Sequence, residues 1–370
     1  MRALPHLGAE AQFLGWKVRH AIGLPQTGHD EFTDGPGCSG QRGIFQTRQK
    51  APRVTSQPAK TILITGANSG LGKDVARQLA LRPDFDRIYL GCRNSDKAEL
   101  AKQDLQRVTG RSIFEVVIID LSDLASVRAA AATIDRPLDA VLLNAGGTGG
   151  PAPASLTVDG VTAVFAQNVL GHVVLLEELI DGGALTEVAV LTGSEAARGV
   201  PKLRIPRPSF NDSSVEEFAS VIDGSFFRGR KFNAMLAYGQ VKYLGALWMA
   251  ALARRHPELR FITMSPGNTA GTEAMRDQPA LMRMIASRVV LPYVMPALGI
   301  GHKLEVGARR LVDAVTDPTL QTAVFYASAA NTITGPVIDQ AEIVLDLRDE
   351  IIQEHAYAAI HRFASQASPA

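Results

Sequence analysis

The stretch TGANSGLGKD, from Thr65 to Asp74, decides how the rest of the chain is interpreted. Its glycines, Gly66, Gly70 and Gly72, stand at G-x-x-x-G-x-G spacing. A P-loop that cradles ATP needs G-x-x-x-x-G-K followed by Ser or Thr, because the hydroxyl binds magnesium. Here five residues separate Gly66 from Gly72, and Asp74 stands where the hydroxyl should be. Because a carboxylate there would repel phosphates, the stretch argues against ATP.

The same glycines fit a turn that receives a dinucleotide. Without side chains, they let the backbone bend sharply and approach a pyrophosphate, which then sits at the positive end of the following helix. Many strand-to-helix turns are rich in glycine, but this one follows the first strand of an alternating series. The cofactor-binding residues expected in the turn are Gly66, Ser69, Gly70, Leu71 and Gly72.

The end of the second expected strand, LGCRN, indicates which dinucleotide is bound. NAD is usually selected by an acid that accepts from the ribose hydroxyl, and NADP by a basic residue that meets the extra phosphate. The chain has Cys92 and Arg93 at this point and no acid. A guanidinium suits bidentate phosphate binding, so NADPH is expected rather than NADH. A plain surface arginine is the alternative.

From Thr61 onward, short apolar runs alternate with helical patterns. Strands are expected at TILIT (61–65), RIYLGCR (87–93), FEVVIIDL (114–121), LDAVLLNAG (138–146), EVAVLTGS (187–194) and LRFITMSPG (259–267). Helices are expected at 72–82, at 95–108 with Ser95 as N-cap, and at 124–134, 161–180 and 236–256. Such alternation predicts a parallel sheet covered on both faces. The expected fold is α/β, a Rossmann-type doubly wound sheet in a single domain.

This domain is expected to cover residues 58–340, with a substrate insert at 195–236 and a lid at 268–302. A C-terminal helix is expected at 341–366, because that stretch is amphipathic. Residues 1–57 show no periodicity, and we expect a poorly ordered N-terminal extension. A targeting segment is the alternative, since basic residues outnumber acidic ones there.

Composition narrows the partners. With 46% apolar and 20% charged residues the chain has enough material for a core. A net charge of +1 offers no general attraction for nucleic acid, which favours a small-molecule partner. Cys38 and Cys92 form no disulfide or metal pattern, so a reducing, cytoplasmic location and no metal are expected. The apolar window at 289–301 is too short for a membrane span.

Polar residues near the expected strand ends suggest proton-transfer chemistry. Tyr238 and Lys242 in YGQVK stand four apart and share one face of a helix. A nearby ammonium favours the phenolate and would bring the pKa of the tyrosine towards working range. Ser194 could hydrogen-bond a substrate carbonyl, or simply cap a helix. Asn168, inside an apolar helix, could hold a water that links Lys242 to solvent, or make a structural hydrogen bond.

These motifs occur together and in order: TGANSGLG, NAG at Asn144–Gly146, NVLG from Asn168, YGQVK, and SPG at Ser265–Gly267. From about Lys60 to Gly335 the chain resembles the short-chain dehydrogenase/reductases. The resemblance implies a catalytic set of Ser194, Tyr238, Lys242 and Asn168. It also implies that Lys242 bonds the nicotinamide ribose and that the subunits form dimers or tetramers. The further cofactor contacts that it implies are Tyr238, Asp120, Leu121, Asn144, Ala145, Gly146, Pro266, Gly267 and Thr272.

Within that family the chain is similar to the branch of retinol dehydrogenases and light-dependent protochlorophyllide reductase. The similar parts are TGANSGLGK, GCRN, the insert before Tyr238 and the stretch at 315–328. The photoenzymes carry a cysteine, a proposed proton donor, directly after the Pro-Gly pair, whereas this chain has Asn268. An ordinary dark reductase is therefore favoured, with a photoenzyme as the alternative.

The insert and the lid supply aromatic residues for an apolar pocket or a mobile lid. These are Phe210, Phe218, Phe226, Phe227, Phe232 and Tyr293. Residues 281–295 mix arginines with apolar residues, so peripheral membrane contact is an alternative. The chain is thus expected to be an NADPH-dependent carbonyl reductase or alcohol dehydrogenase for an apolar substrate, with Tyr238 as acid or base. The competing class is a catalytically silent NADP(H)-binding sensor.

Overall fold

The computed structural model describes residues 59–269 and 301–365. All of them belong to the compact unit Ser56–Ala370. The expected extension at 1–57, most of the expected lid at 268–302, and Thr272 and Tyr293 within it lie outside the described residues.

The described residues form an eight-stranded sheet in the order β3-β2-β1-β4-β5-β6-β7-β8. The strands are β1 Lys60–Thr65, β2 Phe85–Cys92, β3 Phe114–Ile118, β4 Leu138–Leu143, β5 Leu185–Thr192, β6 Arg260–Met264, β7 Val324–Ser328 and β8 Val337–Asp339. Neighbours pair in parallel except β8, which runs antiparallel to β7. The predicted doubly wound fold is confirmed, and its strand order reverses between β1 and β4.

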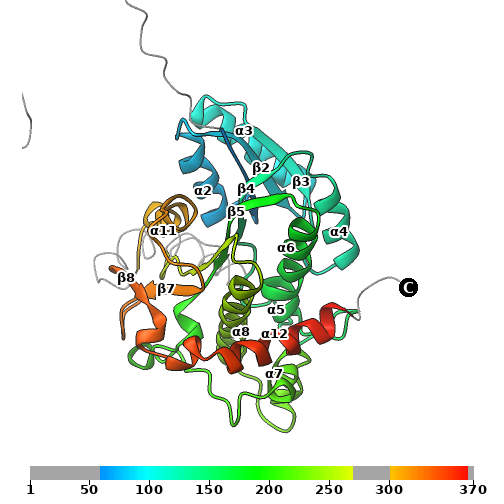
Figure 1. Cartoon of the computed structure of the whole chain (residues 1–370), viewed down its shortest axis with the longest axis vertical. Coiled ribbons are helices and arrows are strands. Elements are labelled where there is room, and N and C mark those ends of the chain that lie inside the picture. The colour runs from blue at the N-terminus through cyan, green and yellow to red at the C-terminus, as the bar shows by residue number, and fades with distance from the viewer. Residues whose placement is uncertain (1–58, 270–300, 366–370) are drawn as a thin grey trace, which may run out of the picture. The chain divides into compact units, whose positions relative to one another are not determined.

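Helices cover both faces of this sheet, as Figure 1 shows. They are α2 Gly70–Ala80, α3 Ser95–Thr109, α4 Leu124–Ala132, α5 Ala163–Phe165, α6 Gly171–Asp181, α7 Val215–Ile222, α8 Ala234–Arg255, α11 Leu304–Thr316 and α12 Glu350–Ala364. Helices α2, α3 and α11 share one buried apolar cluster with Ile62 and Ile64, and α4, α6 and α8 share another with Leu63. This alternation along β1 follows from the two-residue period of a strand.

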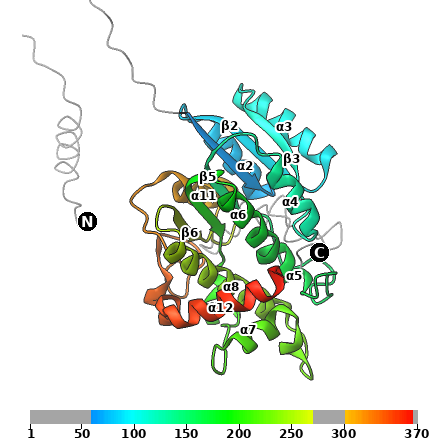
Figure 2. The same cartoon turned by 45° about the vertical axis from the view of Figure 1, so that its right-hand side comes forward.

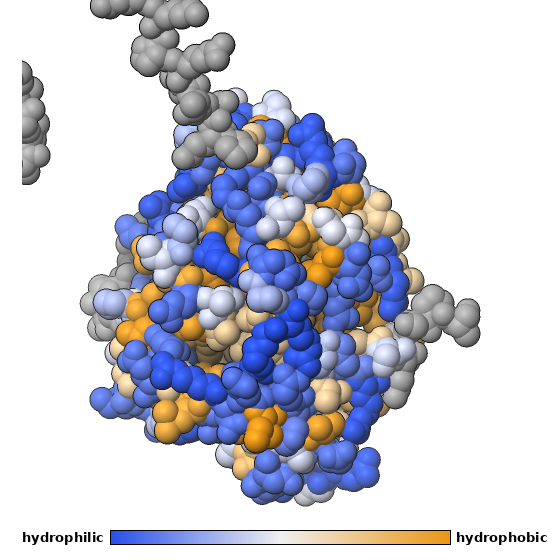
Figure 3. Space-filling model, in the orientation of Figure 1, coloured by the Kyte–Doolittle hydropathy of each residue, from blue (hydrophilic) through white to orange (hydrophobic). Residues whose placement is uncertain are grey.

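Hydrophilic residues predominate on the face drawn in Figure 3, with smaller apolar patches between them. Some large apolar side chains are exposed, among them Leu345 and Ile351 at the start of the C-terminal segment. Exposed apolar residues of this kind are ordinary on a folded protein whose core is closed.

The start of the C-terminal helix differs from the prediction. In place of one helix over 341–366, two 3₁₀ turns at Gln340–Glu342 and Leu345–Arg348 precede α12. The helix begins only where Asp349 can cap it, accepting from the amides of Ile351 and Ile352. From there α12 packs across α8 and α7 (Figure 2). Similarly, Asn94 rather than Ser95 caps α3, because its side chain reaches the amide of Lys97.

The apolar helix expected at 161–180 is interrupted by a π turn at Ala166–Leu170, between α5 and α6. The run Ala163–Asp181 is long and apolar enough to cross a membrane by length and composition, which the sequence analysis did not anticipate. However, 72% of its apolar window is buried inside the fold. That burial is typical of a core helix in a packed domain.

We predict that Glu354 fastens α12 in a pH-dependent way. Its carboxylate meets Arg254 and Arg255 on α8 at 2.7 and 2.5 Å, and the hydrogen bond from Arg255 lowers its pKa to about 2. Because the folded pKa is depressed, the stabilisation is present above the usual pKa near 4.5 and is lost as the pH falls towards 2. Glu354→Gln should lower the free energy of unfolding by about 1 kcal/mol at pH 7, since the pair is partly screened by solvent.

Urea unfolding of both proteins from pH 7 down to pH 3 measures this effect. The difference between wild type and Glu354→Gln should shrink below about pH 4.5. A difference that stays constant over this range would contradict the assignment.

Candidate active site

The glycine turn after β1 forms a cradle at the point where the strand order reverses. Gly66 and Gly70 adopt φ values of +68° and +53°, the left-handed region that glycine tolerates best. A Cβ on Gly72 would lie 2.5 Å from the carbonyl oxygen of Gly66. Only a glycine at position 72 therefore lets the helix lie this close to the turn. In the described first turn of α2 there is no acidic residue, and Ser69 makes no side-chain cap bond. The helix amides are therefore available to an anion.

An open cavity of about 330 Å³ lies over this cradle. Most of the expected cofactor-binding residues line it, namely Gly66, Ser69, Gly70, Leu71, Arg93, Asp120, Leu121, Asn144, Ala145 and Gly146. Lining residues that the sequence analysis did not single out for this role are Thr65, Asn68, Gly91, Cys92, Ile119 and Gln167. Gly72, Tyr238, Lys242, Pro266 and Gly267 are not among its lining residues. Glycine, free amides and an arginine at one cavity fit the phosphates of a dinucleotide.

The residues beside the glycines have separate tasks. Lys73 donates to Asp104 on α3 at 2.7 Å, so its charge is used between helices. Asp74 accepts from Arg77 and Gln78 on its own helix. The side chain of Arg93 is 64% exposed, so its guanidinium is accessible at the cavity. Its Nε lies 3.9 Å from Oδ2 of Asp120. Burial raises the pKa of Cys92 to about 11, so this residue is a neutral thiol.

A buried hydroxyl joins the two strand ends that bound the cradle. Thr65, the last residue of β1, accepts from the amides of Asn144 and Ala145 at 2.8 and 2.9 Å. Its hydroxyl also lies 3.0 Å from Nε2 of His172, whose Nδ1 is 3.2 Å from the carbonyl oxygen of Asn168. Since that carbonyl can only accept, Nδ1 carries the proton and Thr65 donates to Nε2. Burial, followed by the charge of Lys242, lowers the pKa of His172 to about 3, so the ring is neutral.

Sequence reasoning missed His172, because a histidine in an apolar helix is indistinguishable there from a core residue. The clue in the sequence was its spacing of four from Asn168, which places both on one helix face. In the structure this face holds the loop after β4 against the glycine turn.

Asn168 is fully buried, and its side chain is occupied by backbone groups. Its amide donates to the carbonyls of Gly147 and Val164, both at 2.8 Å, and its oxygen accepts from the amide of Gly147 at 3.1 Å. These bonds fix the segment that follows Asn144–Gly146 along the cavity. Of the alternatives given above, the structural hydrogen bond is the one observed for this side chain.

Tyr238 and Lys242 lie near each other on α8. Nζ of Lys242 is 5.7 Å from the centre of the Tyr238 ring and donates to the carbonyl oxygen of Thr192, at the end of β5, at 2.9 Å. The lysine is 4% exposed, and burial lowers its pKa to about 8. At neutral pH the ammonium form therefore still predominates.

The expected effect of Lys242 on the phenol is not found in this structure. Burial raises the pKa of Tyr238, a hydrogen bond with Ser194 opposes this in part, and the carboxylate of Glu195 raises it further. At more than 5 Å from the ring centre, the ammonium does not outweigh the loss of water around the phenol. Tyr238 is therefore held as a protonated acid.

Ser194 follows β5 and lies beside Tyr238. Its hydroxyl accepts from the amide of Ala196 at 3.2 Å, so it caps the 3₁₀ turn Glu195–Ala197 and also meets Tyr238. The turn lies close to α8 because Gly239 has no side chain: a Cβ there would be 2.6 Å from the carbonyl oxygen of Ala196. Gly239 thus permits the approach of Tyr238 to Ser194, a role that the sequence analysis did not identify.

The aromatic residues of the insert divide into two groups. Phe218 is fully buried, and Phe210 packs on it and on Tyr243, so these two belong to the core and not to a pocket. Phe226, Phe227 and Phe232 instead pack edge to face just before α8. Only this second group stands close in sequence to Tyr238.

Comparison with known proteins gives a consistent picture. The family model for short chain dehydrogenase matches residues 60–196. Human retinol dehydrogenase 11 is 34% identical over 204 residues, 54% of this chain and 57% of the relative, so the chain spans little more than half of that protein. Chloroplastic protochlorophyllide reductase B of Oryza sativa subsp. japonica is 31% identical over 73% of this chain and 69% of its own length.

Solved structures share the fold at low identity. A short chain dehydrogenase from Burkholderia cenocepacia, in complex with NADP, superposes with a TM-score of 0.52 at 19% identity, covering 76% of this chain and all of the other. L-sorbose reductase from Gluconobacter frateurii, complexed with NADPH and L-sorbose, superposes with a TM-score of 0.54 at 15% identity over 75% of this chain and 97% of its own.

We predict that Gly239→Ala separates Tyr238 from Ser194. The new methyl group would meet backbone and not a flexible side chain, so α8 must shift. We expect a loss of about 1–3 kcal/mol in stability and at least about a tenfold loss of turnover. Gly245→Ala on the same helix is the matched control, because its Cβ meets the tips of Leu191 and Val169. Equal effects of the two substitutions on turnover would refute the role of Gly239.

Proposed function

The chain belongs to the short-chain dehydrogenase family, and from that premise we propose that it is an NADPH-dependent reductase of apolar carbonyl compounds, able to oxidise the matching alcohols in reverse. One observation carries the proposal: Ser194, Tyr238 and Lys242 converge at the carboxyl end of β5. A protein that only sensed the cofactor would not need these groups together.

The residues of the chain divide the chemistry among them. When bound, the cofactor supplies the hydride. The hydroxyl of Ser194 hydrogen-bonds the substrate oxygen and stabilises the charge that develops on it. Tyr238 donates its phenolic proton to that oxygen. The raised pKa of Tyr238 keeps this proton in place at neutral pH, which suits the reductive direction.

Lys242 has its own part in this arrangement. Its ammonium donates to the carbonyl oxygen of Thr192 and is buried inside the fold. From this position it would orient the nicotinamide ribose. Asn168 would hold the segment after Asn144–Gly146 in place through its hydrogen bonds with Gly147. Pro266, Gly267 and Thr272 would cover the nicotinamide. The amides of α2 and Arg93 would take the phosphates.

The names of the relatives bear on the substrate. Retinol is an apolar alcohol, and retinol dehydrogenase 11 supports an apolar alcohol or carbonyl as the substrate class. The match to protochlorophyllide reductase extends over more of this chain and supports a photoenzyme as second candidate. Asn268, which stands directly after the Pro266–Gly267 pair, lacks a thiol proton, so the dark reaction is preferred.

We predict that Tyr238→Phe abolishes carbonyl reduction while NADPH still binds. Loss of a general acid costs about 10²–10⁴-fold in rate. The assay follows the NADPH absorbance band with a panel of apolar aldehydes and ketones. Tyr243→Phe, which alters a core tyrosine of the same helix stacked on Phe210, is the control.

The same assay separates the alternatives. Activity that survives Tyr238→Phe would rule out the proposed acid. NADPH binding by wild type without turnover of any carbonyl would favour the sensor. Turnover of protochlorophyllide in light but not in darkness would favour the photoenzyme.

We predict that Arg93→Ala weakens the preference for NADPH. Losing a charge-assisted phosphate contact should raise KM for NADPH by about tenfold or more and leave KM for NADH nearly unchanged. Arg107→Ala, which removes an exposed arginine on α3 paired with Asp104, is the control. An unchanged ratio of the two KM values would show that Arg93 is a plain surface residue.

A further inference from the structure

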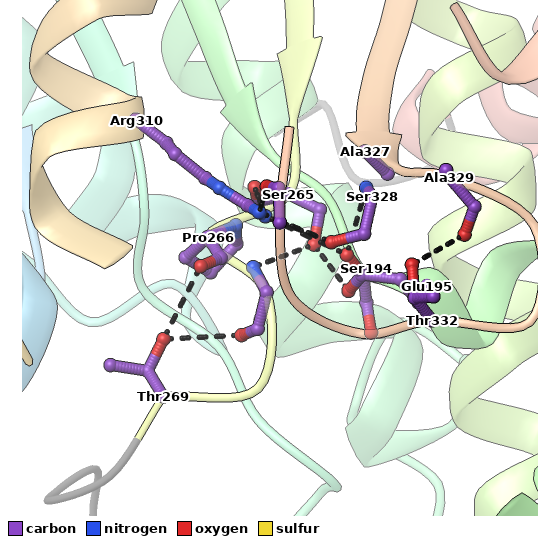
Figure 4. A network of polar contacts seen from close by, with 12 residues as sticks. Ser194, Glu195, Ser265, Pro266, Thr269, Arg310, Ala327, Ser328, Ala329 and Thr332 are labelled. Atoms are coloured by element: carbon purple, nitrogen blue, oxygen red, sulfur yellow. Dashed lines mark hydrogen bonds and ion pairs between the residues drawn. The ribbon is translucent and has the colours of Figure 1, made fainter. Parts of the chain in front are cut away.

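A buried carboxylate stands directly after Ser194, and apart from its effect on the pKa of Tyr238 it has no part in the proposed reaction. Glu195 is 4% exposed. Its Oε2 accepts from the hydroxyl of Ser265 at 2.6 Å, and its Oε1 accepts from the amide of Ser328 at 3.2 Å. These contacts connect the ends of β5, β6 and β7, as Figure 4 shows.

Arg310 of α11 supplies the opposite charge. Its Nη1 lies 3.8 Å from Oε1 of Glu195, and the guanidinium is buried as well. It donates to the carbonyl oxygen of Ser265 at 3.3 Å, to the hydroxyl of Ser328 at 3.1 Å, and to the carbonyl oxygen of Gly335. The arginine therefore holds the same strand ends as the glutamate, from the opposite side.

A second buried arginine completes the network. Arg198, in the turn after Glu195, donates to the carbonyl oxygens of Ser328 and Ala329 at 3.0 Å and of Thr332 at 2.7 Å. The loop after β7 is thereby fastened to the segment that carries Ser194. Buried pairs of this kind are costly, and well-packed apolar residues would often be as stable. Stability alone is thus a poor account of why charges occupy this edge.

One hydroxyl connects the network to the turn Ser265–Gly267, the part of the chain that would cover the nicotinamide (the nicotinamide wall). Ser265 donates to Glu195 and accepts from the amide of Gly267 at 3.1 Å. Gly267 has φ of +75°, and a Cβ there would lie 2.8 Å from Arg310 and from His302. The turn Ser265–Gly267 is therefore shaped by Glu195 on one side and by Arg310 on the other.

We propose that Glu195, clamped by Arg310, is a positioning residue that holds Ser194 and the turn Ser265–Gly267 at a fixed separation. The peptide chain links the carboxylate to the group that would polarise the substrate, and a hydrogen bond links it to the wall that would cover the nicotinamide. The inference rests on the proposed function. It adds a residue pair that sets the distance between substrate and cofactor.

The charge of Glu195 has a separate electrostatic consequence. Tyr238 faces Ser194 and Glu195 and shares α8 with Lys242, while Arg310 and His302 lie next to Glu195. The carboxylate raises the pKa of Tyr238, after the larger effect of burial. Removing it should lower that pKa. Reduction requires the protonated phenol, so the loss of activity at high pH should begin at lower pH.

Two variants test the proposal. Glu195→Gln removes the charge, and Ser265→Ala removes only the hydroxyl that passes the constraint to Gly267. In both we expect kcat to fall about tenfold or more, because small displacements of reacting groups are costly. Affinity for 2′,5′-ADP, which lacks the nicotinamide half, should stay within about twofold. The high-pH limb should move to lower pH in Glu195→Gln.

Binding measurements provide a readout that does not depend on turnover. The affinity gain of NADPH over 2′,5′-ADP should shrink in Glu195→Gln and Ser265→Ala, because the nicotinamide wall is no longer held. Glu354→Gln, which removes a carboxylate from an arginine pair on α12, is the matched control and should leave the gain unchanged. Should wild type bind NADPH but reduce no carbonyl, the proposed function fails, and this affinity gain still decides the positioning role.

Folding is controlled with a double variant. Glu195→Gln leaves Arg310 buried without a counter-charge and could unfold the protein. Glu195→Gln/Arg310→Met removes both charges, and we expect it to recover Tm without recovering kcat. Recovery of both Tm and kcat would show that the pair is only structural and overturn the proposal. So would values of kcat and of the affinity gain in Ser265→Ala that match those of wild type.

Discussion

A parallel sheet that reverses its strand order leaves a crevice where two neighbouring loops part, and the site of this protein depends on that constraint. The reversal lies between β1 and β4. The hydroxyl of Thr65 spans it, because it accepts from the two amides that follow β4 while donating to His172. The crevice is thus held at a fixed width, and the glycines on one side leave its floor to backbone amides.

The catalytic edge solves a different physical problem, the burial of charge. Lys242, Glu195 and Arg310 are all nearly inaccessible to water, and each is satisfied by strand-end carbonyls, amides or hydroxyls. Parallel strands end together at this edge and supply such groups in a row. The same burial moves the pKa of Lys242 down and that of Tyr238 up, so both retain their protons at neutral pH.

The sequence analysis reached the parts of the fold that are encoded locally. Strands with continuous apolar runs, such as Ile62–Ile64, were found, and the glycine turn was correctly separated from a P-loop. The sequence analysis did not predict the strand Val324–Ser328 or the helix Leu304–Thr316, although the strand is mostly apolar and the helix is amphipathic. The sequence analysis placed the start of the C-terminal helix too early, at residue 341, because amphipathic spacing does not show which residue will cap a helix.

The sequence by itself determined the alternation of strands and helices and the glycine turn, because each depends on residues close together in the chain, and it suggested the candidate reacting groups. Only the tertiary structure decided what those groups experience. Glu195 meets Arg310 and Ser265 across more than one hundred and about seventy residues respectively, and Gly239 matters because Ala196 lies against it. The protonation of Tyr238 follows from how much water the assembled fold excludes, and burial of this kind exists only after distant segments have packed.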